Sequence, residues 1–162
     1  VWINASYMVI LGLERYGFRA EAGELAFRTA DGVYRNFEKT GEFWEFYDPD
    51  QDGISRLKRK TGKVRLGRTQ KPRPEFIGWT GLVNNLVIEQ LIGLQKGQGR
   101  CWIEPNFPAW AAGARFRLAL PAESIELELE LQDRGFIKGR LTAAGIGRDF
   151  SLAPGKRLDL RY

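Results

Sequence analysis

The chain has 162 residues, of which 43% are hydrophobic and 28% are charged, and its formal net charge is +5. This length suits one globular domain, or a helical part and a strand-rich part that share a core. The sequence contains no histidine, which excludes Ser-His-Asp triads, Cys-His pairs and most zinc or iron sites. The one cysteine, Cys101, cannot form an intramolecular disulfide, and no segment is apolar over the length of a membrane span. We therefore expect a soluble protein without a metal site.

Three segments have the hydrophobic pattern of helices. Residues 2–16 are apolar almost all round and stop at Gly17, so we expect a buried helix. In residues 19–39 the apolar side chains form one stripe and the charged ones face away, which predicts a helix on a surface. Residues 77–94 repeat the first pattern and predict a second buried helix. This succession favours a layered array in which inner helices line a centre and outer helices cover them.

From Arg100 onward the hydrophobic period changes to two, which predicts antiparallel strands with one exposed face. We expect these strands at residues 114–120, 125–131, 136–143, 148–152 and 157–162. We expect turns at residues 121–122, 133–135, 145–147 and 154–155, the spacing of hairpins in a small sandwich. A polar connector at residues 95–98 would separate a helical part, 1–95, from a β part, 99–162.

A glutamate among aromatic residues follows the second helix. Glu45 lies between Trp44 and Phe46, and Tyr47 comes next. A carboxylate partly shielded by rings can act as a general base, and aromatic rings offer faces on which the C–H groups of a pyranose pack. The alternative is an ordinary solvated acid beside core aromatics, and the local sequence does not decide between the two.

The two helices that we expect to be buried both begin with residues able to meet a ligand. Trp2 and Asn4 open the first helix, where Asn4 could bind a ligand hydroxyl or cap the helix. Trp79 opens the third helix, where it could pack in the core or serve as a platform for a sugar ring.

Two charged segments between the second and third helices have a less specific pattern. Residues 48–53 resemble the start of a calcium loop, but the twelfth position is Arg59 where a glutamate is required, so we interpret them as a surface turn. Basic residues gather between Arg56 and Arg73 without a stacking-aromatic or groove-binding motif. We interpret this segment as a solvated loop rather than a nucleic-acid site, the weaker alternative.

Four motifs, taken in order, resemble glycoside hydrolase family 63 and its trehalase-like relatives. They are Val1-Trp2-Ile3-Asn4-Ala5-Ser6-Tyr7, Gly12-Leu13-x-x-Tyr16-Gly17, Trp44-Glu45-Phe46-Tyr47-Asp48-Pro49 and Phe76-Ile77-Gly78-Trp79-Thr80-Gly81-Leu82. The resemblance implies an α+β chain: three helices from an α/α toroid, part of an (α/α)6 barrel, followed by a small antiparallel β region that covers barrel helices. The chain would be the C-terminal portion of such a glycosidase.

The resemblance also implies a mechanism. Glu45 would be the general base of an inverting α-glycosidase that hydrolyses α-linked gluco- or manno-oligosaccharides, with water as the nucleophile and no cofactor. The residues that it places near the sugar are Trp2, Asn4, Trp44, Tyr47 and Trp79. The general acid of the family lies before the first motif, and this chain has no such segment. We therefore expect the chain alone to be inactive.

Two kinds of partner follow from this interpretation. The first is an oligosaccharide substrate, and the second is the missing N-terminal part of the barrel or another protein chain; we expect no nucleic acid and no membrane. The alternative function is a non-catalytic carbohydrate-binding or partner-docking module, in which the bare faces of the first and third helices form an interface. Without an initiator methionine or a signal peptide, the chain is expected to be part of something longer. The cytoplasm is favoured, although signals on a preceding segment would not be visible.

Overall fold

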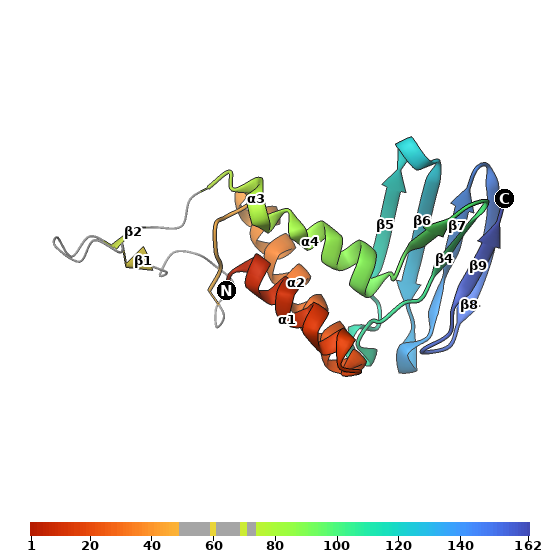
Figure 1. The fold of residues 1–162 in the computed structure, drawn as a ribbon, viewed down its shortest axis with the longest axis horizontal. Coiled ribbons are helices and arrows are strands. Elements are labelled where there is room, and N and C mark those ends of the chain that lie inside the picture. Colours follow the sequence, from red (N-terminus) through yellow and green to blue (C-terminus); the bar gives the residue numbers. More distant parts are fainter. Residues whose placement is uncertain (49–58, 61–68, 71–73) are drawn as a thin grey trace. The chain divides into compact units, whose positions relative to one another are not determined.

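The computed structural model describes residues 1–48, 59–60, 69–70 and 74–162. The chain divides into two compact units, Val1–Leu86 and Val87–Tyr162. Within the described residues, three helical segments are followed by two small antiparallel sheets, so the protein is α+β (Figure 1). The short strands β1 (Arg59–Lys60) and β2 (Thr69–Gln70) pair antiparallel between the second and third helical segments. Residues 49–53 of the predicted surface turn, and most of the basic segment, lie outside the described residues.

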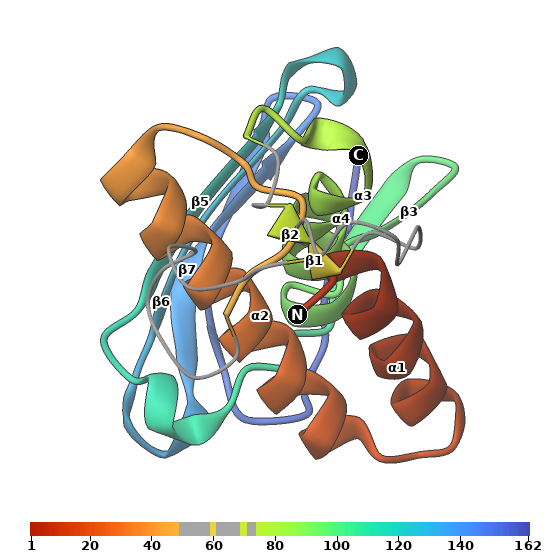
Figure 2. The same ribbon diagram turned by 90° about the vertical axis from the view of Figure 1, so that its left-hand side faces the viewer.

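The first unit begins with two helices that lie side by side, α1 (Ile3–Arg15) and α2 (Arg19–Thr40) (Figure 2). Both helices were predicted from the sequence and are confirmed. Helix α2 ends at Gly41, whose positive φ of 72° suits a residue without a side chain, and the Gly41 N–H donates to the Phe37 carbonyl. The predicted apolar stripe of α2 is buried at Ala22, Ala26 and Val33. The amphipathic pattern therefore orients α2 correctly.

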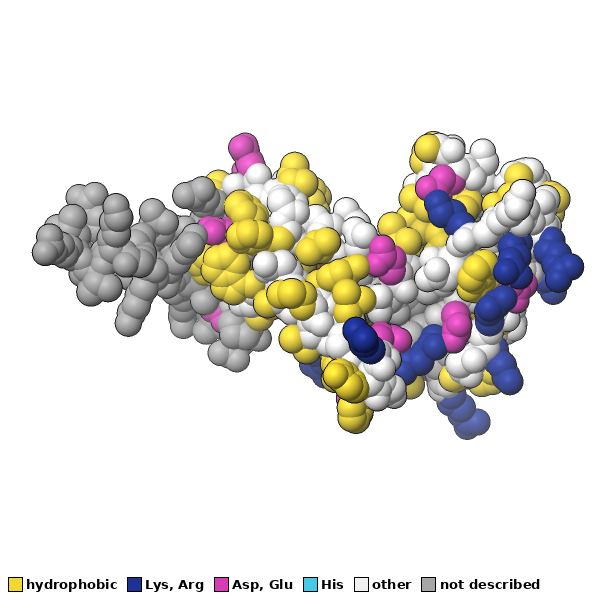
Figure 3. Space-filling model, viewed as in Figure 1, with side chains coloured by type: hydrophobic (Ala, Val, Ile, Leu, Met, Phe, Trp, Pro, Cys, Tyr) yellow, Lys and Arg dark blue, Asp and Glu magenta, His cyan; other side chains and the backbone are white. Residues whose placement is uncertain are grey.

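Helix α1 is less buried than its sequence predicts. Among its residues, Ile3 and Ile10 are buried, whereas Met8, Val9 and Leu11 are 64%, 54% and 41% exposed. Figure 3 shows hydrophobic side chains gathered over this helix. The expectation of a buried helix is wrong for this chain, because the elements of its unit cover one side of α1 and leave the other side bare.

The third helical segment is interrupted where one continuous helix, 77–94, was predicted. It consists of α3 (Ile77–Thr80), α4 (Leu82–Asn85) and a π-helical turn, Leu86–Leu91. Gly78 has non-helical dihedral angles, φ −34° and ψ −107°. In the π turn the N–H of Ile92 donates to the carbonyl of Val87, five residues earlier, at 2.8 Å. The hydrophobic pattern of the sequence does not reveal a distorted residue or a π turn within a helix.

The second unit contains the two sheets. The three-stranded sheet has the order β3 (Gln95–Gly97), β4 (Arg100–Ile103) and β9 (Leu158–Arg161), and the four-stranded sheet is a meander of β5 (Arg115–Leu120), β6 (Ile125–Leu131), β7 (Ile137–Ala143) and β8 (Ile146–Leu152). All these pairs are antiparallel, as predicted.

Two local expectations in the second unit are wrong. Residues 95–97, expected to be part of a connector, form the edge strand β3. The hairpin turn expected at residues 145–147 consists of Ala144 and Gly145, with φ of 49° and 79°, and Ile146 already begins β8. Two residues with positive φ give the tight turn whose twist matches that of paired strands, so the turn needs no third residue.

Apart from the edge strand β3, whose three residues are all exposed, the strands of both sheets have a more buried and a more exposed face. On β6 the isoleucine and leucines are buried, while Glu126 and Glu128 point outward and Glu130 is half-buried. The outward residues pair in register with oppositely charged ones, as in the ion pairs Arg117–Glu128 at 3.3 Å and Arg115–Glu130 at 3.3 Å. Alternation of this kind keeps one face in the core and the other in water.

Among the described helices, none is both long enough and apolar enough to cross a membrane.

Gly139 of β7 is the tightest position of the four-stranded sheet. A Cβ atom there would lie 2.1 Å from the carbonyl oxygen of Glu128 and 2.9 Å from Cα of Leu129. Both are backbone atoms of the paired strand, so they cannot yield without disturbing the ladder. We expect Gly139→Ala to lower the free energy of unfolding by about 2 kcal/mol, as overpacking does, in thermal or urea unfolding followed by circular dichroism.

The matched control is Gly32→Ala, because a Cβ at Gly32 of α2 meets no atom within 4 Å. This change should stabilise the helix by about 0.5–1 kcal/mol. A Gly139→Ala protein as stable as the parent would contradict the close packing of β6 against β7.

Candidate functional site

The candidate site is built around residues 41–48, which leave α2 without regular secondary structure. Peptide groups outside helices and sheets still need hydrogen-bond partners when they are buried. The N–H of Tyr47 donates to the carbonyl of Val1 at 2.9 Å, which ties the segment to the start of α1. The N–H of Phe76 donates to the carbonyl of Phe43 at 2.8 Å, which ties it to the residues before α3. Segments from three parts of the first unit thus meet here.

The main chain on either side of the predicted catalytic glutamate is held by side chains of α3. The hydroxyl of Thr80, which is fully buried, donates to the carbonyl of Trp44 at 2.7 Å. The indole N–H of Trp79 donates to the carbonyl of Glu45 at 3.3 Å. Two consecutive carbonyls therefore have fixed directions, and the backbone that carries the Glu45 side chain is fixed with them.

Glu45 is buried, with 4% of its surface exposed. The neighbouring rings form a connected cluster. The rings of Trp2 and Phe46 stack with centroids 5.3 Å apart, those of Trp2 and Trp79 are tilted at 5.6 Å, and Phe76 adds to Trp79 at 5.0 Å. Two predicted sugar-binding residues, Trp2 and Trp79, are therefore in contact although 77 positions separate them in the sequence.

Tyr47 stabilises the same segment from inside. Its hydroxyl accepts a hydrogen bond from the N–H of Trp44 at 3.1 Å, and the residue is 5% exposed. Burial raises the pKa of the Tyr47 phenol, because it disfavours the charged phenolate, and the hydrogen bond from Trp44 lowers this pKa in part. The indole N–H of Trp44 donates to the hydroxyl of Thr40 at 3.1 Å. The ring of Trp44 is thus tied to the end of α2.

Asn4 has an unusual environment. Its side-chain oxygen Oδ1 is buried and has no hydrogen-bond partner in the part of the chain that the structure describes. A buried carbonyl oxygen without a partner costs about 1–3 kcal/mol relative to a satisfied one. Such an oxygen can accept a hydrogen bond from a hydroxyl group of a ligand. The N-cap of α1 is Trp2, with no side-chain cap, so capping does not explain Asn4.

The structure brings Glu45, Trp2, Tyr47 and Trp79 together through these contacts, and Asn4 lies two residues after Trp2 in the first turn of α1. Three contributors were not predicted: the Thr80 hydroxyl, the Phe76 ring and the carboxylate of Glu42, which accepts the N–H of Glu75 at 2.9 Å. The motif that contains Trp79 and Thr80 was recognised in the sequence, but nothing in it shows which carbonyl Thr80 binds.

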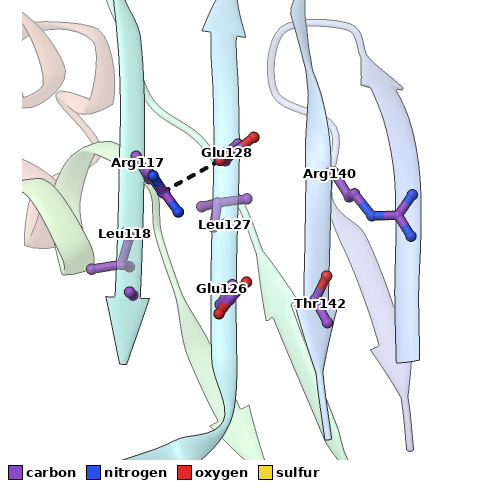
Figure 4. A pocket seen from close by; sticks show the side chains of 8 residues that line it. Arg117, Leu118, Glu126, Leu127, Glu128, Arg140 and Thr142 are labelled. Atoms are coloured by element: carbon purple, nitrogen blue, oxygen red, sulfur yellow. Dashed lines mark ion pairs between the residues drawn. The ribbon is translucent and has the colours of Figure 1, made fainter. Parts of the chain in front are cut away.

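The pocket on the four-stranded sheet is a weaker candidate for a functional site. A shallow pocket of about 160 Å³ lies on the exposed face of the four-stranded sheet (Figure 4). Figure 4 shows Arg117 and Glu128 directed toward each other across β5 and β6, while Arg140 extends over β8, where it pairs with Asp149 at 2.9 Å. These charges are paired with one another, so the pocket is a gap between surface side chains. The described residues contain no cluster of three potential metal ligands.

Comparison with known proteins links the chain to a carbohydrate-active enzyme. A probable mannosyl-oligosaccharide glucosidase of Schizosaccharomyces pombe is 31% identical over 99 residues. The match covers 55% of this chain and 10% of that protein, so it spans about a tenth of the length of the relative. This is a distant and partial similarity to a glycosidase. It agrees in part with the resemblance to glycoside hydrolase family 63.

No family model matches the chain, and no solved structure matches it.

The Thr80 hydroxyl allows a direct test of how the site is held. We expect Thr80→Val to lower the free energy of unfolding by about 1–3 kcal/mol, because the half-buried carbonyl of Trp44 loses its donor. Thr142→Val makes the same chemical change on β7 and should stay within about 0.5 kcal/mol of the parent. Urea unfolding measures both, and equal stability of the two variants would show that the Thr80 bond does not anchor the segment.

The raised pKa of Tyr47 predicts that the stability of the protein falls at alkaline pH. Because burial raises the pKa of Tyr47 in the folded protein, the contribution of Tyr47 to stability is fully present below its unfolded pKa of about 10 and is lost as the pH rises through the folded pKa. Burial also raises the pKa of Tyr34, so ultraviolet titration of the phenolates should show tyrosines that ionise later than free tyrosine, and one of them should disappear in Tyr47→Phe. If Tyr47→Phe kept as many late-ionising tyrosines as the parent, the raised pKa would not belong to Tyr47.

Proposed function

We propose that this chain is the C-terminal portion of an inverting α-glycosidase that acts on α-linked gluco- or manno-oligosaccharides, with Glu45 as its general base. The proposal rests on the partial similarity to the S. pombe glucosidase and on the arrangement around Glu45. The observation that carries it is that Glu45 is buried beside the Trp2–Phe46–Trp79 cluster on a backbone whose carbonyls are fixed by Thr80 and Trp79.

A general base works when its carboxylate is held at a fixed position relative to the attacking water. The Trp79 bond to the Glu45 carbonyl and the Thr80 bond to the preceding carbonyl contribute to that fixation through the main chain. The low exposure of Glu45 limits the number of waters that can reach it. These features suit a residue that activates one water molecule.

The sugar would be bound by groups around this carboxylate. The rings of Trp2 and Trp79 offer apolar faces for the C–H groups of a pyranose. The unpaired Oδ1 of Asn4 would accept a hydrogen bond from a sugar hydroxyl. Tyr47 and Trp44 would act on the edge of the site, because their polar atoms already bind the main chain and Thr40.

Inverting hydrolysis needs a second carboxyl group about 6.5–9.5 Å from the base to protonate the leaving oxygen. We propose that a further part of the barrel, on the same polypeptide or on another chain, supplies this general acid. The three helical segments would then be the last helices of an (α/α)6 toroid, and the bare side of α1 would face its missing neighbours.

A non-catalytic docking module is the second candidate, and one observation favours it. Met8, Val9 and Leu11 of α1 are exposed together, and apolar surface of this kind marks interaction sites. In this function the helices would bind a partner and Glu45 would be a structural acid. Size-exclusion chromatography with light scattering tests this candidate, because a well-behaved monomer counts against a partner bound through α1.

Replacing Glu45 tests the enzyme proposal. In the longest gene product that contains this chain, Glu45→Gln keeps the shape of the side chain and removes its basicity, so kcat on α-linked glucosides or mannosides should fall by about 10²–10⁴-fold. The matched control, Glu38→Gln on the exposed side of α2, should leave kcat unchanged. The isolated chain should show no measurable turnover. Wild-type turnover in the Glu45→Gln protein would remove Glu45 from the mechanism.

A further inference from the structure

The exposed face of the three-stranded sheet carries an excess of positive charge. Strand register places Arg100 of β4 opposite Arg161 of β9, and Trp102 of β4 opposite Asp159. Like charges directly opposite each other on a sheet destabilise the pair. Figure 3 shows Lys and Arg side chains gathered over β8 and β9. The pairing of Arg100 with Arg161 is therefore unfavourable, and both residues are exposed rather than part of the core.

Asp159 is the centre of this cluster. Its carboxylate receives two hydrogen bonds from Arg157, at 2.9 and 2.6 Å, and its backbone carbonyl receives one from Arg148 at 3.1 Å. The hydrogen bonds from Arg157 lower the pKa of Asp159, and the charges of Arg157, Arg100 and Arg161 lower it further. Three guanidinium groups thus act on this carboxylate, and a fourth, that of Arg148, binds the backbone carbonyl of the same residue.

One further carboxylate acts on the cluster. Glu104, together with Asp159, raises the pKa of Arg157. Among the described residues, the four arginines around Asp159 outnumber the two acids, Asp159 and Glu104, that act on them. We name the four arginines, Arg100, Arg148, Arg157 and Arg161, the arginine cluster.

The exposed face of the four-stranded sheet gives an internal comparison. There the arginines are matched one to one with acids, in the pairs Arg115–Glu130, Arg117–Glu128 and Arg140–Asp149. The same unit therefore contains one sheet face that is neutralised internally and another that is not. The excess of positive charge is therefore confined to the face of the three-stranded sheet. Such a charged surface attracts an anionic partner.

The kind of anion follows from Trp102. The guanidinium groups of Arg100 and Arg157 lie over its ring, 5.1 and 4.8 Å from the centroid, and Gly97 lies beside it. A ring that already carries two cations is closed to base stacking, which sequence-tolerant binding of single-stranded nucleic acid relies on. The stacking holds the guanidinium groups in place instead. Guanidinium groups held in this way bind carboxylates in a bidentate geometry.

We propose that the arginine cluster on β4, β8 and β9 is a docking surface for an acidic protein segment, which would place its carboxylates on Arg100 and Arg161. Carboxylates on alternate residues of an extended segment lie about 6.6–6.8 Å apart. That spacing lets one segment reach arginines on two strands. The surface shares no residue with the proposed catalytic site, so its test does not depend on the glycosidase proposal.

Fluorescence anisotropy with a labelled peptide tests the proposal. The probe is a peptide of alternating glutamate and serine about twelve residues long, and the reference is the same peptide with glutamine for glutamate. We expect binding of the acidic probe that weakens as salt is raised, because charge complementarity is screened. The glutamine peptide should not bind.

Two double variants with the same loss of charge locate the site. Arg100→Gln with Arg161→Gln should weaken binding of the acidic peptide by about tenfold or more, whereas Arg115→Gln with Arg117→Gln should change it by less than about twofold. Circular dichroism checks that both proteins are folded. If both double variants lost the same amount of peptide binding, the binding would depend only on the net charge of the protein, and the proposal would be overturned. The same holds if no peptide binding is detected at low salt, or if an oligothymidine of equal charge binds more tightly through Arg100 and Arg161.

Discussion

The packing of the first unit depends on the hydrogen bonds that the peptide groups of residues 42–47 must find. Residues 42–47 form neither helix nor strand, so their peptide groups cannot satisfy one another and must find partners elsewhere. They find them at Val1, at the residues before α3, and in the side chains of Thr80 and Trp79. Because these partners come from separate parts of the sequence, the irregular segment joins the helices as much as the helices support it.

If Glu45 is the general base that we propose, its position is set in part by bonds to its main chain. The hydroxyl of Thr80 and the indole of Trp79 bind main-chain oxygens, so they position the backbone that carries the Glu45 side chain. Tyr47 contributes in the same way, since its hydroxyl accepts the N–H of Trp44. A carboxylate with a prearranged backbone needs little reorganisation when a reaction begins, which is the condition for effective acid–base catalysis.

Local hydrophobic period predicts much of this fold. The alternation on β6 and the one-sided stripe of α2 each indicate their element and its buried face, because a single period persists over the whole element. The interruptions were not predictable in this way. A π turn and the distortion at Gly78 change the winding while the residues remain apolar, and the tight turn at Ala144 depends on backbone angles rather than on composition.

The candidate site was also predictable only in part. Glu45, Trp2 and Trp79 were identified as residue types suited to a sugar, and the resemblance to a glycosidase family put them in one context. Their mutual contacts could not be read from the sequence, because they depend on which helix packs beside which. The role of Thr80 was equally hidden, since a threonine that binds a distant carbonyl looks the same in sequence as one that faces water.

The π turn at Leu86–Leu91 has a consequence for how the chain tolerates changes in length. A π turn holds one residue more than the α turn that it replaces, so it is equivalent to a single-residue insertion absorbed within a helix. Loss of one residue there would return the winding to the α form, with the hydrogen bonds re-formed between residues four apart. We expect homologous chains to differ by one residue in this segment while keeping a continuous helix, which makes it a natural place for an alignment gap.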